Sequence, residues 1–181
     1  MIAIIAEKPS VGLDIARVVG ADTRNDGYCS GNGYMVTWAL GHLVSLAMPD
    51  TYGYTKTAAE DLPMLPDPFR LVSRQMRTDR GMVTDIAASK QLKVIESVFN
   101  RCDSIIVATD AGREGELIFR WIYDFLGCTK PFRRLWISSL TDEAIRKGLE
   151  ELKDGSEYDS LYAAADSRAK ADWLVGMNAS R

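Results

Sequence analysis

The chain has 181 residues, of which 46% are hydrophobic and 26% charged, a composition typical of a soluble globular protein. Its net charge of −3 is not that of a protein that binds nucleic acid over its whole surface. No apolar run approaches the ~20 residues of a membrane span, and the N-terminus lacks the basic segment of a secretory signal, so we expect a cytoplasmic protein outside the membrane. Three widely spaced cysteines and a single histidine argue against a disulfide framework and against a zinc site.

The first half of the chain predicts a strand, a helix, a hairpin and a long connection. The continuous apolar run 2–6 is typical of a strand that is buried on both faces, and a helical repeat follows over residues 9–19. Residues 27–40 alternate in polarity around an Asn-Gly pair, which indicates a hairpin. Residues 45–80 hold four of the six prolines, so we expect an irregular connection with at most a short strand at 69–72.

The second half of the chain alternates helices and strands. Buried strands are expected at 104–109 and 134–137. Helices are expected at 82–100, 117–127, 141–153 and 157–177. The alternation predicts an α/β fold with a largely parallel central sheet and helices on both faces. Ligands of such folds bind at the carboxyl ends of the strands.

Two polar clusters fall at that edge of the predicted sheet. Glu7 and Lys8 follow the first strand. Asp110, Glu114 and Glu116 follow a later strand, and carboxylates so close together repel one another. Mg²⁺ would relieve the repulsion, because it binds one or two carboxylates and keeps several waters, so the clusters indicate a metal-assisted phosphoryl-transfer site. The alternative is that these charges only complement helix dipoles at the surface, and for Glu116 we favour that surface role.

The clusters and their flanks resemble a known family. A Glu after the first strand and an Asp-x-x-x-Glu-Gly-Glu run after a later strand resemble the Toprim domain. Five blocks, in order, are similar to those of type IA DNA topoisomerases of the topoisomerase III kind: AEKPSVGLDIARVVG, TWALGHLVSL, ATDAGREGELIFRWIY, RLWISSLTDEAI and ADSRAKADWLVGMNASR. The resemblance implies a Toprim domain over residues 1–155 and, over 156–181, the start of a helical domain that guides the DNA strand.

The resemblance also implies roles for single residues. Glu7 matches the general acid/base at the scissile phosphodiester, and Lys8 matches a lysine that contacts the scissile phosphate. Asp110 and Glu114 match two members of an acidic Asp-x-Asp-x-Glu set that holds Mg²⁺, with Glu7 nearby. The middle member of that set is absent, because the chain has Gly112 there, which puts the usual grip on the metal in doubt.

Further residues of the matching blocks have two interpretations each. His42 and Arg113 match catalytic-site residues, but a structural histidine and a simple ion pair are the alternatives. Arg168, Asp172 and Arg181 match the block that contacts DNA, although Arg168 and Asp172 could instead form an intrahelical pair.

Two other features have a structural interpretation that we favour. Trp173 and Leu174 are expected in the core rather than as a platform for bases. The arginines between residues 70 and 80 are expected on a solvated loop rather than along a phosphate path.

For the complete protein, the resemblance implies cleavage and rejoining of one DNA strand through a 5′-phosphotyrosine link, with Mg²⁺ and without ATP. The nucleophilic tyrosine of the family lies downstream of these blocks, so we expect the 181-residue chain alone to be inactive. The expected partner is single-stranded DNA, with a helicase as a further candidate, and we expect a monomer at the bacterial nucleoid. Two alternatives stay open: another Toprim enzyme, such as a nuclease or primase, and a non-enzymatic Toprim scaffold of the recombination-mediator kind.

Overall fold

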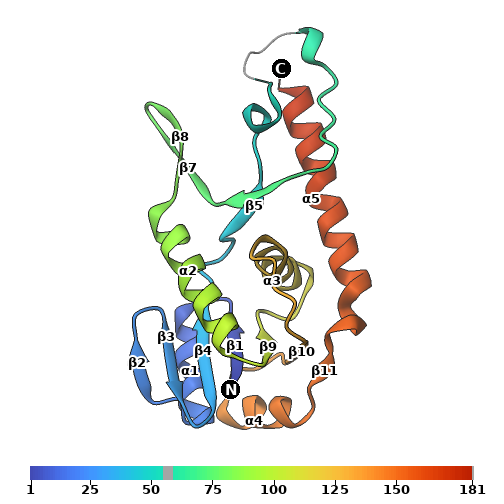
Figure 1. The fold of residues 1–181 in the computed structure, drawn as a ribbon. Helices are drawn as coiled ribbons and strands as arrows, with labels where there is room; N and C mark the ends of the chain where they lie inside the picture. Colours follow the sequence, from blue (N-terminus) through green and yellow to red (C-terminus); the bar gives the residue numbers. More distant parts are fainter. Residues whose placement is uncertain (55–58, 181) are drawn as a thin grey trace.

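A computed structural model describes residues 1–54 and 59–180 of the chain. Its main strands are β1 (Ile2–Ala6), β2 (Thr23–Asn25), β3 (Tyr28–Gly31), β4 (Tyr34–Trp38), β9 (Ser104–Ala108), β10 (Phe132–Arg134) and β11 (Lys153–Asp154). Its α-helices are α1 (Pro9–Val19), α2 (Ile86–Arg101), α3 (Arg113–Phe125), α4 (Asp142–Glu150) and α5 (Asp159–Ala179). Within the described residues the main strands form one seven-stranded sheet in the order β11-β10-β9-β1-β4-β3-β2 (Figure 1).

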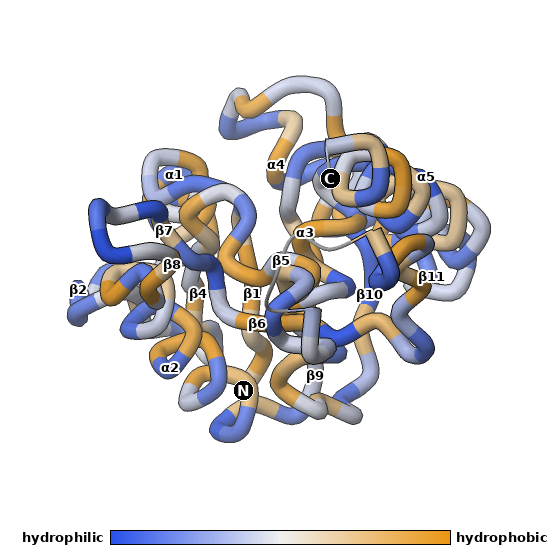
Figure 2. The backbone as a smooth tube through the Cα atoms, turned by 90° about the horizontal axis from the view of Figure 1, so that it is seen from above, coloured by the Kyte–Doolittle hydropathy of each residue, from blue (hydrophilic) through white to orange (hydrophobic). Residues whose placement is uncertain are grey.

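The centre of this sheet is parallel, as the alternation of elements predicts. Strands β10, β9, β1 and β4 run parallel to one another, and antiparallel neighbours extend both edges. Successive residues of β1 are buried in different cores: Ala3 and Ile5 pack toward α2 and α3, whereas Ile4 and Ala6 pack toward α1 and α4. Figure 2 shows the apolar central strands enclosed by elements of mixed polarity. The predicted α/β class, with helices on both faces, is confirmed.

Local sequence signals account for several element boundaries. Helix α1 starts at Pro9 and ends at Gly20, whose φ of 81° lies in the left-handed region that suits glycine. The hairpin turn between β3 and β4 has positive φ at both Asn32 and Gly33, as the Asn-Gly signal predicts. Thr141 caps α4, because its hydroxyl accepts a hydrogen bond from a backbone N–H in the first turn.

The segment expected to be an irregular connection is more ordered than its composition predicts. It forms two small sheets, β5 (Val44–Leu46) with β6 (Leu71–Ser73), and a hairpin of β7 (Gln75–Thr78) and β8 (Gly81–Thr84). It also contains the 3₁₀ turns η1 (Pro49–Tyr52) and η2 (Ala59–Asp61). The expected strand at 69–72 is realised as β6, one to two residues later.

Two boundaries differ from the prediction for physical reasons. Helix α2 begins at Ile86 rather than residue 82, because Asp85 caps it and the preceding residues pair as β8. Strand β10 ends at Arg134, where a strand over 134–137 was expected, and the arginine is buried in an ion network described below. A further 3₁₀ turn, η3 (Gly155–Tyr158), leads into α5.

Helix α5 is held along its length by segments far away in the sequence (Figure 1). Trp173 is 7% exposed, donates its indole N–H to the carbonyl of Ala47 at 2.9 Å, and meets the rings of Tyr52 and Phe69 edge-on. Asn178 bonds both the N–H and the C=O of Met64. The core role expected for Trp173 is therefore confirmed, and α5 packs on the rest of the chain. None of the described helices has the length and apolarity needed to cross a membrane.

Candidate functional site

Three strand ends bring the predicted site residues to one edge of the sheet. Strand β1 lies between β4 and β9 and ends level with both. Glu7 follows β1 and Asp110 follows β9, and the backbone N–H of Asp110 donates to Oε1 of Glu7 at 3.2 Å. Gly41, which follows β4, donates its N–H to the backbone oxygen of Glu7 at 3.4 Å. The turn that carries His42 is thereby attached to the same strand end.

The contact with Asp110 changes the acidity of Glu7. Burial of the Glu7 carboxyl raises its pKa, and the neighbouring charge of Asp110 raises it further. The hydrogen bond from the N–H of Asp110 and the charge of Lys8 act in the opposite direction but do not cancel the increase. Glu7 therefore keeps its proton to a higher pH than an ordinary glutamate.

Glu114 has a different partner. Its carboxylate contacts Nε2 of His42, whose ring lies 5.9 Å from that of Trp121, centroid to centroid. No group of three or more His, Cys, Asp or Glu side chains in residues 1–54 and 59–180 lies close enough together to hold a metal ion. The acidic residues thus form two separate contacts, Glu7 with Asp110 and Glu114 with His42, rather than one cluster of three carboxylates.

Two glycines shape the turn between β9 and α3. Gly112 has φ 156° and ψ 176°, a conformation that residues with a side chain rarely adopt. Gly115 lies so close to the carbonyl of Asp110 that a Cβ there would overlap it. The hydroxyl of Thr109 donates to the carbonyl of Gly115 at 2.8 Å and closes the turn. This backbone gives a physical reason why position 112 lacks the acidic side chain of the resembled motif.

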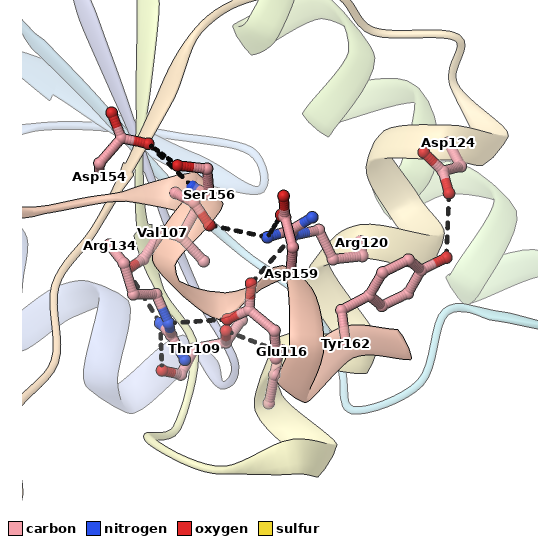
Figure 3. A network of polar contacts seen from close by, with 12 residues as sticks. Val107, Thr109, Glu116, Arg120, Asp124, Arg134, Asp154, Ser156, Asp159 and Tyr162 are labelled. Carbon is pink, nitrogen blue, oxygen red and sulfur yellow. Dashed lines mark hydrogen bonds and ion pairs between the residues drawn. The ribbon is translucent and has the colours of Figure 1, made fainter. Parts of the chain in front are cut away.

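A buried ion network lies against the same turn (Figure 3). Glu116 is fully buried, with Arg120 at 2.9 Å from one carboxylate oxygen and Arg134 at 3.0 Å from the other. Arg134 also donates to the carbonyls of Thr109 and Asp110, at 2.8 and 2.9 Å. Burial lowers the pKa of Arg134, and the charge of Glu116 opposes that change. The surface role favoured for Glu116 is wrong, because both arginines fold over its side chain.

The sequence held only a partial signal for this network. Arg120 follows Glu116 by four residues, a spacing that pairs side chains on one helix face. No local sequence pattern predicts the contact with Arg134, because this residue lies on strand β10 and not on helix α3. Its side chain is only 1% exposed. Arg120 also donates to the carbonyl of Gly155 and to the carboxylate of Asp159, at 2.8 and 2.9 Å, so the network joins α3 to the start of α5.

A cavity of about 600 Å³ lies between α3, α5 and strand β5. Apolar side chains form part of its lining, and its polar lining residues are His42, Ser45, Arg113, Glu114, Arg168 and Asp172. No ion pair within the described residues joins Arg168 to Asp172, so the intrahelical alternative is not realised. The hollow thus presents two guanidinium groups together with apolar side chains.

The remaining predicted residues are placed less centrally. Lys8 is exposed at the N-terminus of α1, directly after Glu7. Arg70, Arg77 and Arg80 are exposed, as a solvated segment would have them, whereas the side chain of Arg74 is partly buried. Arg181 lies outside the described residues.

Comparison with known proteins identifies the family of the chain. The Toprim domain model matches residues 2–140. The chain belongs to the Toprim family. Over 99% of its length it is 50% identical to DNA topoisomerase 3 of Shouchella clausii, and over 98% it is 47% identical to DNA topoisomerase 3 of Bacillus subtilis. In each case the chain spans 24% of the relative.

The Toprim fold also has a solved counterpart. The chain superposes on full-length topoisomerase I from Thermotoga maritima with a TM-score of 0.59 and 18% identity, covering 96% of this chain and 24% of that one. At this identity the match concerns the fold alone. The Toprim resemblance read from the sequence blocks is confirmed by the family match, and the site residues stand at the strand ends of that fold.

Proposed function

We propose that this chain is the Toprim part of a DNA topoisomerase of the type IA, topoisomerase III kind, which cleaves and rejoins one DNA strand without ATP. The observation that carries the proposal is the contact of Glu7 with Asp110 at two adjacent strand ends. It joins a carboxyl of raised pKa to an acidic residue at the edge where α/β folds bind their ligands. Relatives named DNA topoisomerase 3 match over nearly the whole chain and support the same function.

Glu7 is the proton-transfer group of the proposed reaction. When the phenolate oxygen of a tyrosine attacks the scissile phosphorus, the bond to the 3′ oxygen breaks and that oxygen needs a proton. Glu7, with its raised pKa, donates the proton during cleavage and takes it back during rejoining. Lys8, one residue along, places an ammonium group where negative charge develops on the phosphate. The matched segment is 24% of each relative, and we propose that the attacking tyrosine lies outside it, so the chain alone is proposed to be inactive.

The residues at the strand ends fit a hydrated Mg²⁺ ion. The backbone N–H of Asp110 holds the Glu7 carboxylate, and the Asp110 carboxyl lies near enough to raise the pKa of Glu7. Mg²⁺ is commonly held by one or two carboxylates plus waters. We propose that Glu7 and Asp110, together with Glu114, are the residues that hold it. A bound Mg²⁺ would supply positive charge to the phosphate of the DNA. Glu114 contacts His42 in the structure, so its carboxylate would have to leave His42 in order to bind the metal ion.

The cavity beside the site is proposed as the entry of the single strand. Arg113 and Arg168 offer guanidinium groups to phosphates, and the apolar part of the lining suits the faces of bases. Asp172 is an acceptor for base amino groups at the same wall. Arg181 belongs to the same sequence block as Arg168 and Asp172 and is proposed as a further DNA contact. We propose residues 156–181 as the beginning of the strand-guiding domain. We also place the protein, as a monomer, at the nucleoid of the bacterial cytoplasm, with a helicase as candidate partner.

A chimaera tests the proposed function directly. Residues 1–181 replace the matched segment of the Bacillus subtilis DNA topoisomerase 3, and cleavage of a single-stranded oligonucleotide is measured with MgCl₂. We expect cleavage by the chimaera and a loss on the order of 10²–10⁴-fold in the Glu7→Gln chimaera, the size typical of a general acid. A Glu96→Gln chimaera, altered at an exposed position of helix α2, is the matched control. A correctly folded chimaera without cleavage would contradict the proposal.

Mg²⁺ binding separates an enzyme from a scaffold. Calorimetric titration of the 181-residue chain with MgCl₂ should show weak binding that Asp110→Ala abolishes. The control is Asp50→Ala, a change at an exposed 3₁₀ turn far from the strand ends in sequence. A chain with no Mg²⁺-dependent heat, or with heat that Asp110→Ala leaves unchanged, would favour the non-enzymatic scaffold.

A further inference from the structure

Arg74 connects the turn that carries His42 to the second helix. It follows β6, far from the strand ends in the sequence, yet its guanidinium donates to the carbonyls of Leu40 at 2.8 Å and His42 at 3.0 Å. The same group is fixed by Asp85, with Nε 2.9 Å from Oδ2. Its backbone N–H donates to the carbonyl of Leu43 at 2.7 Å. Arg74 therefore donates to three carbonyls between Leu40 and Leu43.

The carbonyl groups of this turn need such a partner, because they take their hydrogen bonds from the Arg74 side chain. Gly41 has φ 69°, in the left-handed region, and the two carbonyls on either side of it both turn to Arg74. On the opposite side, the imidazole of His42 meets Glu114 and Trp121 of α3. The position of the imidazole thus depends on a turn held from behind by Arg74.

Asp85 in turn orients the arginine. Its Oδ1 accepts the N–H groups of Ala87 and Ala88, which fixes the carboxylate at the start of α2. These helix N–H bonds and the Arg74 guanidinium hold the pKa of Asp85 below its usual range. The carboxylate is therefore an ionised, fixed partner for Arg74 at neutral pH.

We propose that Arg74 is a positioning residue for the phosphoryl-transfer site, acting through the Leu40–His42 turn to hold His42 against Glu114. The inference rests on the proposed function for its kinetic consequence, but not for its structural one. The guanidinium reaches the two carbonyls with Nη1 and the carboxylate with Nε, two separate nitrogens of one rigid plane, whereas lysine offers a single compact ammonium group. Lysine at position 74 should therefore keep the positive charge but lose part of the hydrogen bonding that holds the Leu40–His42 turn.

The imidazole itself reports on the proposal, because His42 is the single histidine of the chain. Its ring signals in a ¹H–¹³C NMR spectrum of the 181-residue chain are unambiguous, and the ring current of Trp121 makes them sensitive to position. At fixed pH we expect Arg74→Lys and Arg74→Ala to shift these signals and to weaken the nuclear Overhauser contact between His42 and Trp121. Arg77→Ala, on exposed strand β7, is the control and should change neither.

The kinetic test uses the chimaera described above. In Arg74→Lys we expect the cleavage rate at saturating DNA to fall about 10–100-fold, with KM within about twofold, as for a misplaced catalytic group. Asp85→Asn keeps a side chain that caps α2 but removes its charge. Its cleavage rate should lie between those of the parent chimaera and of Arg74→Lys. Native His42 signals in Arg74→Lys, or a native rate in a chimaera that cleaves DNA, would overturn the proposal. An inactive parent chimaera would instead refute the proposed function and leave the NMR result to decide on Arg74.

Discussion

Gly112 shows how one backbone conformation governs which acidic residues the site can carry. Its φ of 156° is open to glycine but strained for aspartate, the residue of the resembled motif. We predict that Gly112→Asp lowers the free energy of unfolding by about 1–3 kcal/mol. Ala111→Asp places the same charge next door, on an exposed residue without positive φ, and should change it by less than about 0.5 kcal/mol. Urea unfolding measures both, and equal losses would show that charge rather than backbone strain decides.

Glu7 illustrates a conflict between stability and function at a single side chain. Its folded-state pKa is raised, so the folded protein is penalised wherever the carboxylate ionises, above the raised pKa. Below the ordinary pKa the carboxyl is protonated in both states and the penalty is absent. We therefore predict that Glu7→Gln stabilises the chain at pH 7 by less than about 1 kcal/mol, because solvent screens a half-buried group. The gain should disappear as the pH falls to about 4, near the ordinary pKa. Thermal unfolding at the two pH values checks the sign.

At the scale of the element, α3 carries two glutamates with opposite environments. Glu116 is fully buried between two arginines, whereas the side chain of Glu114 is 72% exposed. Removing one partner of a buried ion pair leaves uncompensated charge, so we predict a loss of about 3–5 kcal/mol for Glu116→Gln. Glu114→Gln should stay within about 0.5 kcal/mol. Chemical denaturation measures the free energy of unfolding of both variants, which carry the same substitution on the same helix. Equally small losses in the two would mean that water reaches the buried network.

The same helix marks where prediction from sequence stops. Local rules located the buried strand before it, the polar turn at Asp110 and the helix itself, because apolar runs and turn residues are visible in a single stretch of chain. They could not locate Arg134 beneath the turn or Arg74 behind His42, because each contact joins residues far apart in the sequence. The surface role expected for Glu116 is wrong for that reason. Its position in the first turn of a helix suits an exposed residue, and its burial depends on Arg120 and on the distant Arg134.

At the scale of the whole molecule, the boundary proposed at residue 155 crosses continuous packing. Arg120 of α3 bonds Asp159, Trp121 bonds Asp166, and Trp173 lies in a pocket formed by the segment after β5. The Toprim model itself ends at residue 140, before the α5 residues that make these contacts. Helix α5 therefore completes the hydrophobic core of the α3 face, although its sequence resembles the start of another domain.

Shortening the chain tests whether that boundary separates independent units. A chain that ends at Gly155 loses the Asp159 and Asp166 contacts and exposes apolar surface of α3, so it should be several kcal/mol less stable. We predict a midpoint of thermal unfolding lower by roughly 5–15 °C, given about 2–4 °C per kcal/mol for a domain of this size. Trp173→Ala in the whole chain should shift it in the same direction, and Val175→Ala, which changes an exposed residue of the same helix, should not. If calorimetry finds the shortened chain melting with the whole one, α5 is a separate unit that adds nothing to the core, and the cavity beside it is free to open as the helix moves.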